Sequence, residues 1–337
     1  MIKVLTDKNI KDWRLFLAKH KHLVFHTPEY RTLIKNSFNV KDFYIISHGG
    51  NEIKALLPLF YIKSILFGKR LISVAFLEYG GFAGEGKNVF GIINFLKNYK
   101  PWKNLSLELR QGLDNFDAIL EKELIKRQEY KRFVLELKNK TAEELWGSID
   151  KQKRKAIKKA QRLVKIEELT LKEINDLYNL YCKGMRSFGS PPYPKKYFKN
   201  FFALKLGKCF GAFYKNKLVA LLLGFTYNKI VHITISVSDK RYLEFRPNEC
   251  LHWRFIEWAH KNNFEEFDFG KVREASGQFR FKKEFGAELK ELNHYYISKI
   301  PPKAEPDDYK LIIKLWQHMP LFVTKLFGPR LRKGLGI

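Results

Sequence analysis

Acidic residues are scarce in this sequence relative to basic ones. Its 337 residues include 63 lysines and arginines but only 35 aspartates and glutamates, which leaves a formal net charge of +28. A surplus of this size favours association with anions. We therefore expect an anionic partner, such as nucleic acid, a phosphorylated ligand or the negative face of a membrane, and the charge alone does not choose among them.

Cysteine is also rare. The sequence has three cysteines, Cys182, Cys209 and Cys250, in an odd number and without CxxC spacing. No histidine and cysteine cluster has the spacing of a zinc site. The pattern argues against a disulfide framework and predicts reduced, packed thiols in the cytoplasm, with no metal and no tightly bound cofactor.

Long hydrophobic runs are lacking as well. The longest, Leu218 to Thr226, is about half of the ~20 residues that a membrane-spanning helix requires. The segment from Met1 to Trp13 carries several charges where a signal peptide would need an apolar core. We predict a cytoplasmic protein, whose contact with the inner face of a membrane, if any, is peripheral.

Hydrophobic periodicity shows one pattern twice. The length favours two domains, and each half reads as three strands, a helix, a strand, a helix and a strand. The first copy is expected at 43–48, 53–63, 71–78, 89–96, 105–109, 116–127 and 133–137. The second is expected at 209–214, 218–227, 230–237, 247–261, 264–269, a helix through 281 and 292–298. We predict domains over 1–140 and 141–300, followed by a tail over 301–337.

The order of these elements resembles the acyltransferase fold of the GNAT type. In that fold the fourth and fifth strands splay apart and leave a cleft for an acyl carrier. The expected fold class is therefore α/β (α+β), with tandem GNAT-like domains and mixed, mostly antiparallel sheets flanked by helices.

The most informative segment runs from Phe264 to Glu288. Aromatic and acidic side chains alternate up to Phe269, Gly270 is expected to break the strand, and Ser276 could cap the helix that follows. Cations gathered where a strand opens into a turn and helix suit an anionic ligand at a sheet edge. Those cations are Lys271, Arg273, Arg280, Lys282 and Lys283.

A basic helix is expected between the two halves, within 141–164. Its apolar stripe is predicted to contain Ile149, Ala156, Ala160 and Leu163, and its basic stripe Lys151, Lys155, Lys158 and Arg162. The basic stripe is either a solvated face or a ridge that binds phosphates, because a row of like charges repels itself without an anion.

Several other residues are candidates with a structural alternative. His232 is expected on one strand face with Ser236 and Ser238, as a core residue or a general base. Asp268 is a candidate catalytic residue, although its side chain could instead hydrogen-bond the following turn. Arg186 begins a proline-rich loop that could cover a cleft. The glycine-rich segment 80–86 reads as a loop or, less strongly, as a phosphate cradle.

Eight segments resemble the FemABX-like branch of the GNAT superfamily, including FemAB-related proteins of exopolysaccharide loci. The strongest are FDFG at 267–270 and FKKEFGAE at 281–288, at their mutual spacing. The supporting segments are FHTPEY at 25–30, LEYGG at 77–81, ELR at 108–110, RKAIKKA at 154–160, RSFGSPPYP at 186–194 and RPNECLHW at 246–253.

The resemblance implies transfer of an acyl or aminoacyl group to an amine of a peptidoglycan or exopolysaccharide precursor. It places Lys282 near the reaction centre, where a cation can stabilise an oxyanion. Asp268 is the second catalytic candidate because it nearly ends the strand expected beside the cleft. The substrate-binding candidates are Arg154, Lys158, Arg162, Arg186, Arg273 and Asn248. The acceptor would be a phosphorylated sugar or lipid-linked precursor.

Two donors stay open, aminoacyl-tRNA and acyl-CoA. There is no room for a coiled-coil insertion of the kind found in tRNA-dependent relatives between Val164 and Leu171, and KRYLEFRPNE at 240–249 has no glycine for a pyrophosphate turn. Two alternative functions also stay open, a CoA-dependent N-acetyltransferase and a non-catalytic basic binding protein for anionic polymer or membrane.

The tail from Tyr309 to Ile337 combines large apolar residues with a basic cluster at Arg330, Arg332 and Lys333. This composition suits a helix in an anionic membrane interface, and equally a helix that docks on the protein's own surface.

Overall fold

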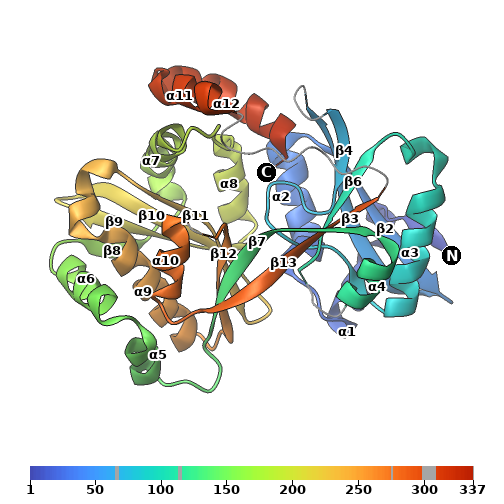
Figure 1. Cartoon of the computed structure of the whole chain (residues 1–337), viewed down its shortest axis with the longest axis horizontal. Helices are drawn as coiled ribbons and strands as arrows, with labels where there is room; N and C mark the ends of the chain where they lie inside the picture. The colour runs from blue at the N-terminus through green and yellow to red at the C-terminus, as the bar shows by residue number, and fades with distance from the viewer. Residues whose placement is uncertain (65–67, 113–115, 275, 298–308, 337) are drawn as a thin grey trace. The chain divides into compact units, whose positions relative to one another are not determined.

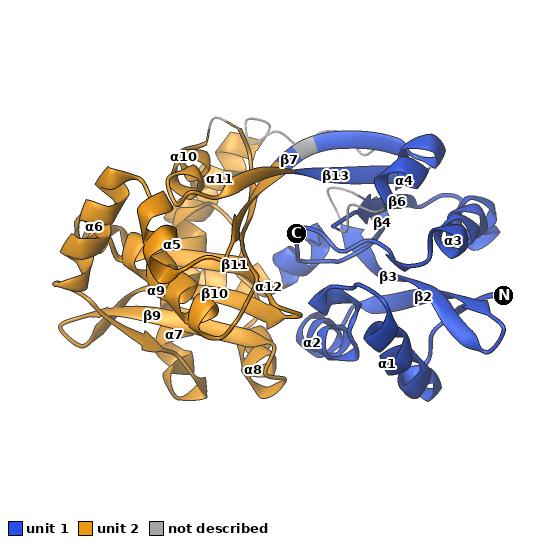
Figure 2. Ribbon diagram, turned by 90° about the horizontal axis from the view of Figure 1, so that it is seen from below, with its two compact units in different colours: residues 1–130, 291–304, 330–337 blue, residues 131–290, 305–329 orange. Residues whose placement is uncertain are grey.

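The computed structural model describes residues 1–64, 68–112, 116–274, 276–297 and 309–336 (Figure 1). The chain forms two compact units, coloured separately in Figure 2. Unit 1 contains residues 1–130, 291–304 and 330–337, and unit 2 contains residues 131–290 and 305–329. The domain division expected after residue 140 stays a prediction, and the one expected after residue 300 lies outside the described residues.

Unit 1 is built on a mixed sheet in the order β1-β2-β3-β4-β6-β13. Its strands are β1 (Ile2–Val4), β2 (Lys41–Gly49), β3 (Glu52–Ser64), β4 (Gly68–Ile72), β5 (Ala83–Gly84), which pairs with β3, β6 (Ser106–Arg110) and the end of β13 (Glu288–Ile297). Its helices are α1 (Ile10–Lys19), α2 (Pro28–Phe38), α3 (Gly86–Asn98) and α4 (Asp117–Glu123). β4 and β6 pair in parallel, and β13 pairs antiparallel with β6.

The glycines before α3 permit close backbone packing. Gly84 has a φ of +118°, and a Cβ added there would lie 2.2 Å from the carbonyl oxygen of Lys54. Gly81 has a φ of +65°, and a Cβ would lie 2.0 Å from the Gln111 side-chain oxygen. Only glycine fits such positions without strain. The geometry therefore supports a structural role for this segment.

A buried ionic cluster holds the centre of unit 1. Arg110 Nε donates to Glu108 Oε1 at 2.8 Å, and His294 Nδ1 lies 3.5 Å from the same oxygen. Arg110 Nη1 also donates to the carbonyl of Leu77 at 2.7 Å. Burial alone would raise the pKa of Glu108, but the charges of Arg110, His294 and Arg70 lower it to about 2. The ELR and LEYGG segments thus meet in the packing of this unit.

Unit 2 repeats the pattern in the order β7-β12-β11-β10-β9-β8. Its strands are the end of β7 (Ile125–Glu136), β8 (Lys165–Glu168), β9 (Gly207–Tyr214), β10 (Lys217–Tyr227), β11 (Ile230–Ser238) and β12 (Glu266–Val272). Its helices are α5 (Ala142–Ser148), α6 (Lys151–Gln161), α7 (Ile174–Ser187), α8 (Lys195–Ala203), α9 (Pro247–Lys261), α10 (Gly277–Lys283), α11 (Lys310–His318) and the first part of α12 (Leu321–Leu335). β11 and β12 form its parallel pair.

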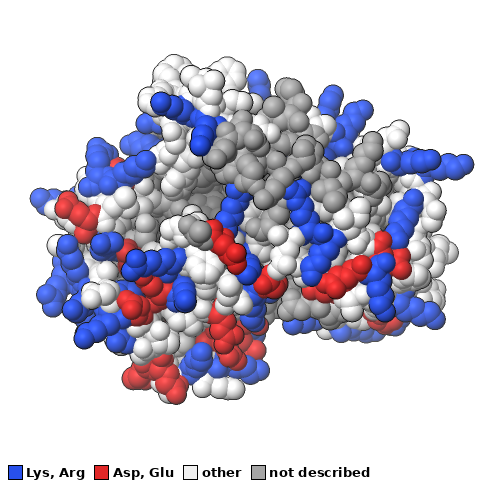
Figure 3. Space-filling model, in the orientation of Figure 1, with Lys and Arg blue, Asp and Glu red and all other residues white. Residues whose placement is uncertain are grey.

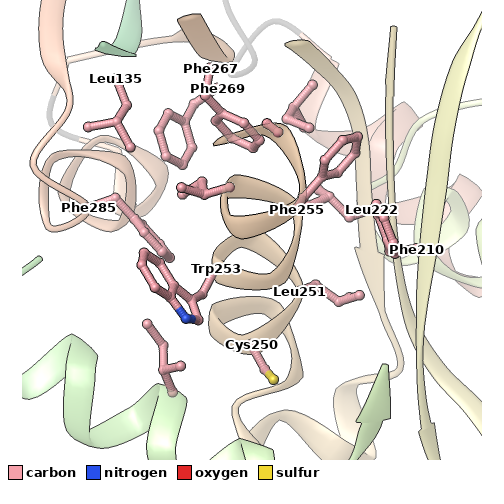
Figure 4. Packing of buried hydrophobic residues seen from close by; sticks show 14 of the residues in the cluster. Leu135, Phe210, Leu222, Cys250, Leu251, Trp253, Phe255, Phe267, Phe269 and Phe285 are labelled. Atoms are coloured by element: carbon pink, nitrogen blue, oxygen red, sulfur yellow. The ribbon is translucent and has the colours of Figure 1, made fainter. Parts of the chain in front are cut away.

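The core of unit 2 surrounds α9. Figure 4 shows Trp253, Leu251 and Phe255 of this helix among Phe210 and Leu222 of the sheet, with Phe267, Phe269 and Phe285 nearby. Phe255 and Phe267 have 0% exposure, so this face of the sheet is sealed by aromatic packing. α7 contacts β10 and β11, where Gly184 lies against Val237.

Each unit is completed by a strand from the other half of the sequence. Residues 131–136 of β7 pair with β12 in unit 2, whereas residues 294–297 of β13 pair with β6 in unit 1. The periodicity located both strands, but the prediction that 133–137 belongs with the first copy and 292–298 with the second was wrong, because strand pairing with distant residues decides which sheet each one joins.

Several predicted element bounds were wrong, among them the starts of the strands expected at 133–137 and 292–298, which begin at Ile125 and Glu288. The strand expected over 71–78 ends at Ile72, and the helix expected to reach Arg127 ends at Glu123 because β7 begins at Ile125. Gly270 does not break its strand, since β12 continues through it to Val272.

Candidate active site in the second unit

The parallel ladder between β11 and β12 stops partway along both strands. The last paired residues are His232 and Asp268. β11 continues to Ser238 and β12 to Val272 without further pairing between them. Two central strands that part in this way leave an opening in the sheet, where their backbone groups no longer bond each other. This opening is the candidate active site.

A β-bulge at Thr234 changes which side chains of β11 face α9. Leu223 of β10 pairs with Ile235 and Gly224 pairs with Ile233, so Thr234 is the extra residue. Val231 and Ile233 pack in the core around α9, whereas Val237, beyond the bulge, lies against α7. Ser236 and Ser238 are therefore not on the face of His232, and that prediction was wrong.

A second bulge lies on β12. Its pairing with β7 shifts between Asp268 and Lys271, and Gly270 has a φ of +74°. Lys282 of α10 holds this bulge, because its Nζ donates to the carbonyls of Gly270 at 2.9 Å and Lys271 at 2.8 Å. Lys282 is 8% exposed, while the neighbouring Lys283 is an exposed residue. The structure thus distinguishes the buried Lys282 from the exposed Lys283, which the sequence alone could not do.

Asp268 is fully buried and bound on both oxygens. Arg132 Nη1 donates to Oδ2 at 2.8 Å, and the Gly270 backbone N–H donates to Oδ1 at 2.7 Å. A carboxylate held in this way fixes the bulge and the neighbouring strand β7. The catalytic role expected of Asp268 stays a prediction, and the geometry adds a positioning role.

His252 connects α9 to the Lys282 region. Its Nδ1 lies 2.8 Å from the carbonyl oxygen of Asn248, which can only accept, so Nδ1 carries the proton. The ring stacks on Phe269 with centroids 5.8 Å apart and meets Phe281 edge-on. Burial lowers the pKa of His252 to about 3, and the positive charges of Lys282 and Lys153 act in the same direction.

His252 should make unit 2 less stable in acid. Its pKa is about 3 in the folded state and ordinarily near 6.5, so the unfolded chain binds the proton more readily between these values. The contribution of His252 to stability is complete above pH 6.5 and falls by about 1.4 kcal/mol per pH unit as pH drops toward 3. We expect His252→Phe to flatten the pH dependence of the urea midpoint in this window. An unchanged slope would show that His252 does not titrate as a buried neutral group.

The first turn of α9 borders the same region. Asn248 Nδ2 donates to Ser238 Oγ at 3.0 Å. Pro247 has no N–H at the first helical position, and the carboxylate of Glu249 lies in the first turn, 3.5 Å from Arg246. Both features reduce the capacity of this helix end to bind a pyrophosphate, since proline removes a donor and glutamate already complements the helix dipole.

α6 carries the predicted basic ridge, and basic side chains gather over it in Figure 3. All four stripe residues are exposed, namely Lys151, Lys155, Lys158 and Arg162. Arg154 is half-buried, and its Nη1 donates to the carbonyls of Trp146 and Gly147. The apolar stripe was partly wrong, because Leu163 is 39% exposed and Ile157 is buried in its place.

Lys153 was missed by the sequence analysis. It is 6% exposed, its Nζ lies 3.0 Å from Glu284 Oε2, and the same nitrogen lies 4.0 Å from the centroid of Phe281. It shares a helix face with Ile157 and Ala160, which are both buried. Spacing of i, i+4 and i+7 could have revealed it.

Arg186 and Arg273 were also predicted to bind substrate. Arg186 Nη1 donates to the carbonyl of Met319, between α11 and α12. Arg273 is half-buried in the turn after β12, where its carbonyl accepts from the Ser276 hydroxyl. A role in ligand binding stays a prediction for both arginines.

Metal and thiol chemistry find no support in the part of the chain that the structure describes. No group of three or more His, Cys, Asp or Glu side chains there could hold a metal ion. All three cysteines are free and buried, and burial raises the pKa of Cys182 to about 11 and that of Cys250 to about 12. Such thiols are poor nucleophiles.

Comparison with known proteins agrees with this architecture. Residues 147–283 match the family model described as Acetyltransferase (GNAT) domain. No curated protein sequence matches the chain significantly.

Three solved structures share the fold at low identity. FemX covers 93% of this chain and 100% of its own, with a TM-score of 0.65 and 13% identity. The C-terminal domain of a candidate lysylphosphatidylglycerol synthetase from Agrobacterium fabrum covers 91% and 96%, with a TM-score of 0.61 and 10% identity. A tandem GNAT protein from the clavulanic acid biosynthesis pathway covers 90% and 99%, with a TM-score of 0.56 and 8% identity. The predicted fold class, a tandem GNAT-like α/β protein with mixed sheets flanked by helices, is thereby confirmed.

Proposed function

We propose that this protein is an acyltransferase that forms an amide bond between an acyl or aminoacyl donor and an amine of a cell-envelope precursor, of peptidoglycan or exopolysaccharide. The observation that carries the proposal is the opening between β11 and β12. Each of these strands has a bulge, and Lys282 binds the bulge of β12. The match of residues 147–283 to an acetyltransferase domain supports acyl transfer at this place.

The reaction would proceed by direct transfer. The acceptor amine attacks the donor carbonyl, and the new C–N bond forms as the C–O bond of an aminoacyl ester or the C–S bond of a thioester breaks. The amine loses a proton and the leaving group gains one. The charge of Lys282, held at the bulge by two backbone carbonyls, would stabilise the oxyanion of the tetrahedral intermediate.

The helix end at α9 favours a donor other than CoA. Residues Lys240–Phe245 form a 3-10 helix before Pro247 rather than a glycine-rich turn, and Glu249 occupies the first turn of α9. Backbone amides are therefore poorly placed for a pyrophosphate. FemX and the lysylphosphatidylglycerol synthetase share the fold, and the name of the second denotes an aminoacylated lipid. An aminoacyl donor is accordingly our first choice.

The ridge on α6 suits the acceptor. Lys155, Lys158 and Arg162 are exposed basic residues, and a phosphorylated sugar or lipid-linked precursor supplies the complementary charge. A peripheral contact with the inner face of a membrane would bring the protein to a lipid-linked acceptor.

Thermal shift of the full chain at fixed salt tests the proposal. We expect stabilisation by a UDP-linked muramyl peptide and by a pool of charged tRNA, because a ligand that binds only the folded state raises its stability. Stabilisation by acetyl-CoA alone would replace the proposal by a CoA-dependent N-acetyltransferase. No shift with any of the three would contradict both enzymes and favour the basic binding protein.

A further inference from the structure

The two C-terminal helices each carry a buried face and an exposed apolar face. On α11, Trp316 is 7% exposed while Leu311 is 72% exposed. On α12, Thr324 has 0% exposure while Phe322 is 72% exposed. Large apolar side chains at this exposure are costly in water unless something covers them.

The buried faces of both helices rest on the same support, the end of α7 and the loop after it. Trp316 Nε1 donates to the Ser190 carbonyl at 3.2 Å, and a Cβ on Gly189 would lie 2.3 Å from Ile313. On α12, a Cβ on Gly328 would lie 2.3 Å from Pro192. Since both helices lie against residues 189–192, their opposite faces point away from the same support.

The outward faces follow helical spacing. Leu311 and Leu315 lie four residues apart on α11, and Phe322 and Leu326 lie four residues apart on α12. Leu315 is 58% and Leu326 65% exposed. Residues at i and i+4 share one face of a helix, so each helix offers a continuous apolar strip. We call these four residues the outer apolar surface.

The charged side chains of α11 and α12 themselves have one sign. The sequence from Tyr309 to Ile337 contains no aspartate or glutamate, and its basic residues are Lys310, Lys314, Lys325, Arg330, Arg332 and Lys333. Lys314 and Arg330 are exposed. A second copy of this chain, itself at +28, would repel such a surface, whereas a bilayer with anionic headgroups attracts it.

We propose that the outer apolar surface docks on a lipid bilayer that contains anionic lipids. Leu311, Leu315, Phe322 and Leu326 would enter the boundary between headgroups and acyl chains, and the flanking cations would contact lipid phosphates. The two expectations for the tail are then compatible, since one helix face packs on the protein and the other on lipid. No helix among the described residues is long and apolar enough to cross a membrane.

Vesicle sedimentation of the full chain tests this docking. We expect binding to vesicles of phosphatidylcholine mixed with phosphatidylglycerol, little binding to pure phosphatidylcholine, and weaker binding at high salt. The double substitution Leu311→Glu and Phe322→Glu should lower the partition coefficient at least about tenfold, because it removes two apolar groups and adds negative charge. Lys314→Glu should lower it less, and only on anionic vesicles.

A matched control keeps the test specific. Leu15→Glu with Phe90→Glu changes exposed residues of α1 and α3, which are 61% and 43% exposed, and should bind vesicles like the wild type. Equal binding by both double variants, or no binding by the wild type, would overturn the proposal. The proposal would also be overturned if light scattering showed that the wild type is a dimer and that the double variant Leu311→Glu with Phe322→Glu is a monomer. Binding is measured here rather than turnover, so this proposal and the proposed function can fail separately.

Discussion

Lys282→Ala is expected to lower kcat for acyl transfer about 100- to 1,000-fold, the loss typical for removal of one group that stabilises an oxyanion. Lys282 is buried at the bulge of β12, where its Nζ contacts the carbonyls of Gly270 and Lys271. Because the charge acts on the transition state, kcat should fall while KM for the acceptor changes little. The measurement is the rate of transfer from a charged tRNA pool to a UDP-linked muramyl peptide.

Lys283→Ala is the matched control, since Lys283 is the next residue and is exposed. It should keep the wild-type kcat. If Lys282→Ala and Lys283→Ala had equal rates, Lys282 would have no catalytic role. If Lys282→Ala raised KM and left kcat intact, Lys282 would act in substrate binding alone and not in the chemical step.

Arg132→Met is expected to lower the free energy of unfolding of unit 2 by about 3–5 kcal/mol. Asp268 has no exposed surface, and its Oδ2 accepts from Arg132 Nη1 at 2.8 Å. Removal of the guanidinium leaves a buried carboxylate without its counter-charge, and the desolvation of that carboxylate is no longer offset. Urea unfolding followed by tryptophan fluorescence would measure the loss.

The double variant Arg132→Met with Asp268→Asn separates this cause from simple loss of packing. It removes both charges, so we expect it to recover a substantial part of the stability lost in Arg132→Met. A double variant as unstable as Arg132→Met, or a single variant as stable as the wild type, would contradict the ion pair as the source of the effect.

The sequence was sufficient to predict a strand followed by the helix that carries Lys282, although not where that strand ends. Alternating aromatic and acidic residues predicted β12, and the side chain of Ser276 accepts from the Phe279 N–H as an N-cap, as its position indicated. α9 was predicted with its observed bounds, Pro247 to Lys261, because proline favours the first helical position. Local chemistry decides these features, so a sequence can reveal them.

Features that depend on distant partners could not be predicted. The bulge at Thr234 depends on how β10 and β11 pair, and strand alternation alone placed Ser236 and Ser238 on the wrong face. Arg132 was not a candidate because its partner, Asp268, lies 136 residues away in the sequence. The buried position of Lys282 could likewise not be predicted, because its Nζ binds two carbonyls of β12, which is a different element from its own helix α10.

The mass of the acceptor after incubation tests the central claim most directly. A UDP-linked muramyl peptide would be incubated with the full chain and a charged tRNA pool and then analysed by mass spectrometry. We predict a gain equal to one aminoacyl residue on an amine of the peptide, which disappears with Lys282→Ala and persists with Lys283→Ala. An unchanged acceptor mass, with folded protein and bound acceptor, would contradict acyl transfer and leave a binding protein in its place.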